Sequence, residues 1–317
     1  MDVALLTCSD LPALFSDDQH LLAPLRERGL TPHAVVWDDP RVDWGRFRLA
    51  VVRSVWDYFV KPVEWSAWLE RVTPRLPLLN PPTLLRWNGH KAYLLELAGR
   101  GLPVTPTEKV SPGAPRPLAH IARARGWDEV VVKPAISGGG RLTRRFSREQ
   151  LASVGQGHLD AVLAEGEALV QPFLARLHEE GERSYVFIDG HFSHAVDRAA
   201  TMESGGLPDG VPMAPREDEL ALARQVLAAA PTRTLYARVD VATGPEGGPL
   251  LQELEVIEPR LFLGSAPGAA GRLADAIARE ARAVTPASGF ELAPRPPTAP
   301  SGRSGQTPTP CGMLVQQ

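Results

Sequence analysis

Two runs of alternating apolar and polar residues, separated by a turn, make residues 235–259 the stretch that most constrains how this chain can fold. The first run places four apolar side chains on one face: Leu235, Ala237, Val239 and Val241. The second run places Leu250, Leu254 and Val256 on one face, which they share with Gln252. The break between the runs, at 243–249, is rich in proline and glycine. Period-two alternation on both sides of such a break predicts an antiparallel hairpin.

The polar face of this hairpin carries charges in an unusual register. A turn centred at 246–247 would place Asp240 opposite Glu253, and Arg238 opposite Glu255. Like charges directly opposed are destabilising, and clustered carboxylates raise each other's pKa unless a cation compensates. Mg²⁺ prefers carboxylate and phosphate oxygens. We therefore interpret this face as the surface that binds a magnesium nucleotide. The alternative is a solvated hairpin face that carries ordinary charges.

The composition excludes several classes of protein. With 317 residues and 44% hydrophobic content, the chain can form about two or three packed subdomains. The net charge of -3 gives no basic footprint for nucleic acid, and Cys8 and Cys311 suggest neither a metal site nor a disulfide framework. We find no signal peptide and no apolar run long enough for a bilayer, so we expect a cytoplasmic protein without a membrane partner.

The chain opens with strands and a helix in the order of a small α/β domain. The strands are expected at 2–7, 31–37 and 49–53, and the helix at 17–28. This order predicts an open parallel sheet, which binds ligands at the carboxyl ends of its strands. Four residues at the end of the third strand are therefore candidates for substrate binding: Arg53, Ser54, Trp56 and Asp57.

Arg53 supports two interpretations. Its planar guanidinium matches the two oxygens of a substrate carboxylate. Equally well, Arg53 could pair with Asp57 while Trp56 packs against its neighbours.

Two lysines and a glycine-rich loop indicate a phosphate site. Lys91 would lie in the first turn of a helix predicted at 88–98, where a cation opposes the helix dipole and favours an anionic partner. Lys133 ends a buried strand at 129–133 and supplies a point charge. The loop after it contains Ser137, Gly138, Gly139 and Gly140, and consecutive glycines let backbone N–H groups approach phosphate oxygens. A solvated lysine and a flexible turn are the alternatives, and the spacing is not that of a Walker motif.

The second half of the chain contains further strands and an unstructured end. Strands are expected at 168–174, 182–189 and 191–196, and the last two form a hairpin. His194 falls near the end of this hairpin and is interpreted as a structural or substrate-positioning residue. From residue 286 onward the proline, serine, threonine and glycine content predicts disorder.

Taken together, these motifs resemble the ATP-grasp superfamily of carboxylate–amine ligases over roughly residues 1–285. D-Alanine–D-alanine ligases carry Arg-x-Asp, with Glu-x-Asn beginning thirteen residues past the aspartate. This chain has Arg-Val-Asp at 238–240 and Glu-Leu-Glu at 253–255, at the same spacing. The resemblance implies that three carboxylates bind Mg²⁺: Asp240, Glu253 and Glu255. It also implies that Arg238 contacts the transferred phosphoryl group and the developing oxyanion. Glu255 replaces the usual asparagine, which leaves the number of bound ions open.

The same resemblance implies a nucleotide site. Lys91 and Lys133 match the two phosphate lysines, and residues 137–140 match the mobile glycine loop. The adenine-binding segment would be Gln171, Pro172, Phe173 and Leu174. Glu182 falls where a ribose-binding acid is common, and Arg198 stands where many members have a third lysine. Arg238, Lys133 and Arg198 would then act on the reacting groups.

The implied fold is an α/β (α+β) ATP-grasp fold. It would consist of an N-terminal open α/β pre-ATP-grasp domain at 1–85 and two α+β subdomains, 86–165 and 166–288, that sandwich ATP, followed by a disordered tail at 289–317. Whole phrases such as VVRSVWDY and ELEVIEPRLFL are most similar to the glutathione synthetase-like group that includes O-ureido-serine cyclo-ligase, which closes the cycloserine ring.

The implied function is a ligase that uses ATP and Mg²⁺, or Mn²⁺, to activate a small-molecule carboxylate as an acylphosphate and join it to a nitrogen nucleophile. The nitrogen could belong to the same molecule, in which case a ring closes. An ATP-grasp small-molecule kinase and a non-catalytic nucleotide-binding module are the alternatives. We expect a monomer or a homodimer.

Overall fold

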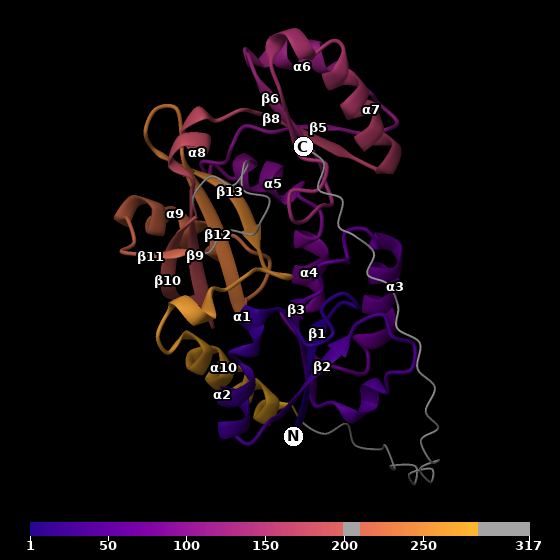
Figure 1. The fold of residues 1–317 in the computed structure, drawn as a ribbon, viewed down its shortest axis with the longest axis vertical. Coiled ribbons are helices and arrows are strands. Elements are labelled where there is room, and N and C mark those ends of the chain that lie inside the picture. The colour runs from indigo at the N-terminus through magenta and orange to yellow at the C-terminus, as the bar shows by residue number, and fades with distance from the viewer. Residues whose placement is uncertain (199–209, 285–317) are drawn as a thin grey trace, which may run out of the picture.

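The computed structural model describes residues 1–198 and 210–284, which form three sheets with their covering helices (Figure 1). The N-terminal sheet is parallel, as the sequence predicted, and its strand order is β2-β1-β3-β4. Its strands are β1 (Asp2–Thr7), β2 (Thr31–Val36), β3 (Leu49–Ser54) and β4 (Leu78–Leu79). Its helical segments are α1 (Ser16–Gln19), α2 (Leu22–Glu27), η1 (Trp44–Arg46) and α3 (Pro62–Val72).

The helix predicted at 17–28 is two short helices, α1 and α2. Pro24 explains the break, because proline has no N–H to donate to the carbonyl of residue 20 in a continuous helix. Within α2 the same proline lies in the first turn, where no intrahelical donor is needed.

A second sheet lies at the far end of the molecule, with strand order β5-β8-β6-β7 (Figure 1). Its strands are β5 (Glu108–Val110), β6 (Val130–Pro134), β7 (Arg144–Phe146) and β8 (Ala168–Pro172). The helical segments that accompany it are α6 (Leu118–Arg125), η2 (Arg148–Gln150) and α7 (Val154–Glu165). Strand β8 pairs with both β5 and β6, so it belongs to this sheet although it follows the domain boundary expected at residue 165.

The third sheet is antiparallel, with strand order β11-β10-β9-β12-β13. Its strands are β9 (Glu182–Ile188), β10 (His191–Arg198), β11 (Val211–Met213), β12 (Tyr236–Thr243) and β13 (Pro249–Glu255). The predicted hairpin and its register are confirmed, since Asp240 lies opposite Glu253 and Arg238 opposite Glu255. A shift in pairing follows Asp240, and a bulge at such a point increases the local twist.

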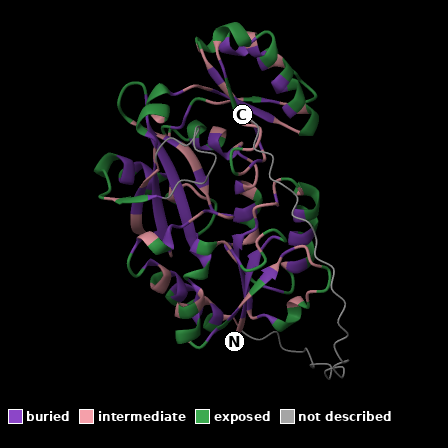
Figure 2. Ribbon diagram, in the orientation of Figure 1, coloured by how far each residue is buried: buried purple, intermediate pink, exposed green. Residues whose placement is uncertain are grey.

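The remaining helical segments complete the fold. They are α4 (Pro82–Asn88), α5 (Tyr93–Gly99), α8 (Ala175–Glu180), α9 (Glu217–Ala228), η3 (Leu263–Ser265) and α10 (Ala269–Ala283). Helix α10 lies beside α2, and its apolar face shares one core with β1, β3, β9 and β12 (Figure 1). The N-terminal and third sheets are therefore packed as one body, with β12 buried along its whole length (Figure 2).

None of the helices in the described parts of the chain is long and apolar enough to cross a membrane. The expected disordered tail, 289–317, lies outside the described residues.

Asn80 fixes the N-terminal domain to the hairpin. Its side-chain amide donates to the carbonyls of Tyr236 at 2.9 Å and Val256 at 2.8 Å, and its oxygen accepts from the backbone N–H of Leu235 at 2.5 Å. The residue is fully buried, so Asn80→Ala would leave three backbone groups without a partner. We expect the free energy of unfolding to fall by about 3 kcal/mol in urea denaturation. The control Val63→Ala, at a position that is 76% exposed, should change it by less than about 0.5 kcal/mol. Equal stability of the two variants would contradict this assignment.

Candidate active site

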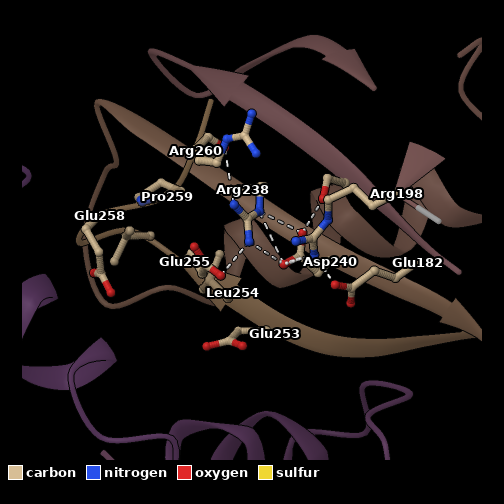
Figure 3. Close-up of polar contacts among 12 residues, drawn as sticks. Glu182, Arg198, Arg238, Asp240, Glu253, Leu254, Glu255, Glu258, Pro259 and Arg260 are labelled. Atoms are coloured by element: carbon tan, nitrogen blue, oxygen red, sulfur yellow. Dashed lines mark hydrogen bonds and ion pairs between the residues drawn. The ribbon is translucent and has the colours of Figure 1, made fainter. Parts of the chain in front are cut away.

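Arg238 and Asp240 lie on the same face of β12. Side chains alternate along a strand, so Val239 and Val241 enter the apolar core while these two charged residues face the opposite way. Arg238 Nε lies 2.9 Å from Asp240 Oδ1, and Nη2 lies 2.9 Å from Oδ2 (Figure 3). The same Nη2 donates to Glu255 on β13. One guanidinium therefore bridges two carboxylates from neighbouring strands.

Asp240 is held by two more side chains. The Ser184 hydroxyl donates to Oδ1 at 2.6 Å, and Arg198 Nη2 lies 2.9 Å from Oδ2. Arg198 also pairs with Glu182 at the beginning of β9 (Figure 3). Burial alone would raise the pKa of Asp240, but Arg198 and Arg238 outweigh it and hold that pKa at about 2. Asp240 is therefore ionised at neutral pH.

Glu255 and Glu258 have the opposite electrostatic environment. Burial raises the pKa of Glu255 to about 7, with Glu253 and Asp240 adding to the rise against the attraction of Arg238. Glu258 follows β13, and burial together with Glu255 raises its pKa well above the ordinary value. Carboxylates in this situation bind protons readily, or a divalent cation in their place.

Carboxylates such as Asp240, Glu253 and Glu255 suit a hard divalent ion, but in this structure they are not arranged as a complete metal site. Among residues 1–198 and 210–284, no group of three or more acidic, histidine or cysteine side chains is arranged to hold a metal ion. The expected convergence of Asp240, Glu253 and Glu255 is therefore incomplete. The physical reason is that each carboxylate is already paired: Asp240 and Glu255 with Arg238, and Glu253 with Lys91.

Lys91 reaches the site from a different position than the sequence suggested. The single helix predicted at 88–98 is two helices, and Lys91 lies in the turn between α4 and α5. Asn88 ends α4 instead of capping a helix, because its side chain bonds to the backbone of Leu254 in β13 and of Val256, which follows that strand. The helix-dipole argument for Lys91 is thus wrong, yet its ammonium group contacts Glu253 directly.

Lys133 and the glycine loop lie at the end of β6. Burial lowers the pKa of Lys133 to about 8, against the attraction of Glu253. The hydroxyl of Ser137 donates to the carbonyl of Pro134 at 3.2 Å, which turns the chain at the start of the loop. Gly139 and Gly140 have φ angles of 58° and 72°, a left-handed conformation that favours glycine. The predicted loop thus has the backbone that its sequence indicates.

The proposed adenine segment runs out of β8. Gln171 is buried and its amide donates to the Thr107 hydroxyl at 2.8 Å. The N–H of Phe173 donates to the carbonyl of Glu129 at 2.9 Å, and the Arg145 guanidinium lies 3.5 Å from the centroid of the Phe173 ring. The two other members, Pro172 and Leu174, continue the strand and precede α8. Sequence analysis missed Arg145, whose place across the sheet depends on the pairing of β7 with β6.

The residues at the end of β3 are bonded to other parts of the protein. Arg53 is fully buried, where it pairs with Asp18 at 2.7 Å and donates to the carbonyl of Pro259 at 2.7 Å. The hydroxyl of Ser54 donates to the same Asp18 at 2.6 Å. The alternative pairing of Arg53 with Asp57 is wrong, because Asp57 bonds to Trp37 and Lys61.

Trp56 and His194 bond to the same connecting segment. The indole N–H of Trp56 donates to the carbonyl of Glu258 at 3.1 Å, and His194 Nε2 lies 2.8 Å from the carbonyl oxygen of Leu261. Burial lowers the pKa of His194, so the ring is neutral at pH 7 with its proton on Nε2. Both residues hold backbone in place. Asp18 and Glu258 were not predicted: Asp18 shows no signal in the sequence, whereas Glu258 follows the acidic motif directly.

The fold and this charged face define a class of protein. The ATP-grasp ligase PsnB, solved with its minimal precursor, Mg and ADP, has the same fold, with a TM-score of 0.60 at 17% identity over 88% of this chain and 97% of that one. The chain is an ATP-grasp enzyme, and the predicted fold class is confirmed. It is a carboxylate–amine ligase by class.

Within that class the family can be named. The cycloserine biosynthesis protein DcsG of Streptomyces lavendulae is 34% identical over 278 residues, which cover 81% of this chain and 91% of DcsG. The crystal structure of D-cycloserine synthetase DcsG matches with a TM-score of 0.82 and 31% identity, over 89% of this chain and all of that one. A family model described as the N-terminal domain of D-cycloserine synthetase DcsG matches residues 3–80. The chain belongs to the DcsG family of ATP-grasp ligases.

The half-buried Lys133 gives the ligand-free protein a characteristic pH dependence. Lys133 has a pKa of about 8 when folded, below its ordinary 10.5, so between these values the unfolded chain binds more protons and stability rises with pH. The charged groups that influence it are Glu253, Lys91 and Glu182. We expect Lys133→Met to be about 2 kcal/mol more stable than the wild type at pH 7, and the difference to close toward pH 10.5. Urea denaturation across this range measures it, with Lys109→Met as the control. A constant difference would contradict the assignment.

Proposed function

We propose that this chain is an ATP- and magnesium-dependent ligase that activates a small-molecule carboxylate as an acylphosphate and joins it to a nitrogen nucleophile. The observation that carries the proposal is the bridge of Arg238 between Asp240 and Glu255, with Lys91 and Lys133 on the same carboxylate cluster. A non-catalytic nucleotide site has no need of a buried arginine among the metal-binding carboxylates.

We further propose that the substrate is O-ureidoserine or a related ureido amino acid, so that joining closes a ring. The product named for the related DcsG, D-cycloserine, supports this choice. In the first step a carboxylate oxygen attacks the γ-phosphorus of ATP, and ADP leaves. In the second step the nitrogen attacks the acyl carbon, phosphate leaves, and the nitrogen loses a proton.

The chain's own side chains supply position and charge for these steps. Phosphoryl transfer depends on alignment and on neutralising phosphate charge more than on covalent help from the protein. Lys91, Lys133 and Arg198 would bind phosphate oxygens, and Arg238 would stabilise the transferred group and the oxyanion. Their cationic groups are now bonded to carboxylates or buried, so nucleotide binding exchanges one anionic partner for another.

Asp240, Glu253 and Glu255 would hold the magnesium ion, or manganese in its place. The raised pKa of Glu255 supports this assignment, because a divalent cation relieves the repulsion among these carboxylates. When bound, the ion would neutralise charge on the phosphates and orient them.

Other parts of the assignment concern the nucleotide and the domains. We propose that residues 171–174 contact adenine and that Glu182 contacts the ribose, with ATP between the second and third sheets. We also propose three domains, with the first boundary near residue 85 and a tail from residue 289. The second boundary, expected at residue 165, is placed at the end of β8, because β8 pairs within the second sheet. We propose further that the enzyme works as a monomer or a homodimer.

An ADP-release screen tests the function. The purified enzyme with ATP and Mg²⁺ would be offered amino acids and ureido amino acids, with and without an added nitrogen nucleophile. O-Ureidoserine alone should release ADP and phosphate together with a cyclic product detected by mass spectrometry. Release of a stable phosphorylated acid would instead identify a kinase. ATP binding without ADP release across the whole screen would leave only a nucleotide-binding module.

Removal of a proposed metal ligand should abolish both metal binding and turnover. Asp240→Asn and Glu253→Gln keep the shape of the side chain but remove its charge, so we expect turnover to fall by about a thousandfold. Binding of Mn²⁺ in the presence of ATP, followed by electron paramagnetic resonance, should weaken in parallel. The control is Glu246→Gln, an exposed change in the turn of the same hairpin. Normal metal binding in both site variants would reject the assignment.

Arg238→Ala should separate catalysis from binding. Because Arg238 is proposed to act on charge that develops during the reaction, we expect kcat to fall by about 10²–10³-fold while ATP affinity changes by less than about tenfold. Single-turnover kinetics and equilibrium ATP titration measure the two quantities. An equal loss in both would assign Arg238 to ground-state binding.

A further inference from the structure

Among the three glycines of the loop, only Gly138 lies where a neighbouring side chain leaves no room for a Cβ atom. A Cβ atom built on Gly138 would lie 2.5 Å from Cε1 and 2.7 Å from Cδ1 of Phe59, closer than real Cβ atoms come. Its φ angle is not in the left-handed region, whereas Gly139 and Gly140 have positive φ and nothing within 4 Å of a built Cβ. The Phe59 ring therefore accounts for glycine at position 138.

Phe59 comes from the N-terminal domain, on a segment that is fixed on both sides. Asp57 accepts a hydrogen bond from Trp37 Nε1 at 2.7 Å and an ion pair from Lys61 at 2.7 Å. Between them, the Tyr58 ring is buried and packs edge-on against Phe59, with centroids 5.6 Å apart. The ring of Phe59 is thus presented to the loop by a rigid support.

The same segment also contacts the opposite side of the site. Trp56 donates to the carbonyl of Glu258, in the chain that follows the carboxylates of β13. Within four residues the segment therefore contacts the chain that follows the hairpin, through Trp56, and the glycine loop at Gly138, through Phe59. The loop in turn begins four residues after Lys133, which interacts electrostatically with Glu253.

We propose that Phe59 is a positioning residue that seats the glycine loop against the N-terminal domain and keeps water from the acylphosphate. This role rests on the proposed ligase function. An acylphosphate exposed to water loses its activation, because water attacks the acyl carbon, the bond to the phosphate oxygen breaks, and the carboxylic acid and phosphate form. Each such event consumes one ATP without forming product, and a closed loop prevents it.

The ratio of ADP released to product formed measures this role directly. With O-ureidoserine, the wild-type ratio should be close to one. Phe59→Ala should raise it by about three- to tenfold, whereas Phe59→Leu, which retains an apolar side chain, should raise it less. The control Val60→Ala changes an exposed neighbour and should leave the ratio unchanged. A ratio near one in Phe59→Ala would overturn the proposal, because a purely structural defect lowers both rates together.

A double-mutant cycle tests the contact itself. Gly138→Ala should raise the ratio because the added methyl group meets the ring, and Phe59→Ala should remove that conflict. We therefore expect the ratio of ADP to product in the double variant to be no higher than in Phe59→Ala alone. If the increases caused by the two single substitutions multiplied in the double variant, Gly138 would act independently of Phe59, and the proposal would be overturned.

Limited proteolysis separates this proposal from the ligase function. Trypsin can cleave after Arg141, whose backbone N–H closes a turn with the carbonyl of Gly138. With Mg²⁺ and adenylyl imidodiphosphate present and no acid substrate, cleavage there should be about three- to tenfold faster in Phe59→Ala than in the wild type or Val60→Ala. Equal cleavage rates would overturn the seating role even if the enzyme is a ligase. Faster cleavage would support it even if the substrate screen fails.

Discussion

The bridge of Arg238 between Asp240 and Glu255 is the interaction on which the architecture of the site depends. All of its members lie on a hairpin whose first strand is buried throughout. Charges so buried carry a large desolvation cost, which is offset only when each has a partner and its remaining hydrogen bonds are made. Ser184 and Arg198 supply these further partners to Asp240 from two other strands, and Lys91 does the same for the neighbouring Glu253. The charges are thereby held in fixed positions, which is the condition for electrostatic catalysis without reorganisation.

The N-terminal domain positions the chain that leaves this hairpin. Arg53 and Trp56 bond to the carbonyls of Pro259 and Glu258, and the hydroxyl of Tyr236 donates to Ile257 at 2.9 Å. A surface loop would leave these carbonyls to water, whereas here each has a buried or half-buried donor. Arg53 and Trp56, which the sequence suggested as substrate ligands, thus bond to the segment that follows the carboxylates of β13.

Sequence reasoning succeeded where the physics is local. The alternation of the hairpin and the length of its turn define which residues face each other, so the pairing of Asp240 with Glu253 could be predicted before any coordinates. Sequence reasoning failed where a residue's conformation depends on partners that are distant in the sequence. Asn88 is a good helix cap in isolation, but its bonds to β13 end α4 and place Lys91 in a turn. The partner of Arg53 is Asp18, thirty-five residues earlier, which only the folded sheet brings near.

The ion network and the glycine loop solve different physical problems. Fixed charges stabilise a transferring phosphoryl group, but they do not protect an activated acyl group, because water reaches any site that remains open. Exclusion of water requires a surface against which the loop can close, and such a surface must be apolar and rigid. Phe59 meets both requirements, since Asp57 and Lys61 fix its segment and Gly138 leaves room for its ring. In the proposed reaction, the N-terminal domain would therefore contribute through shape and the hairpin through charge.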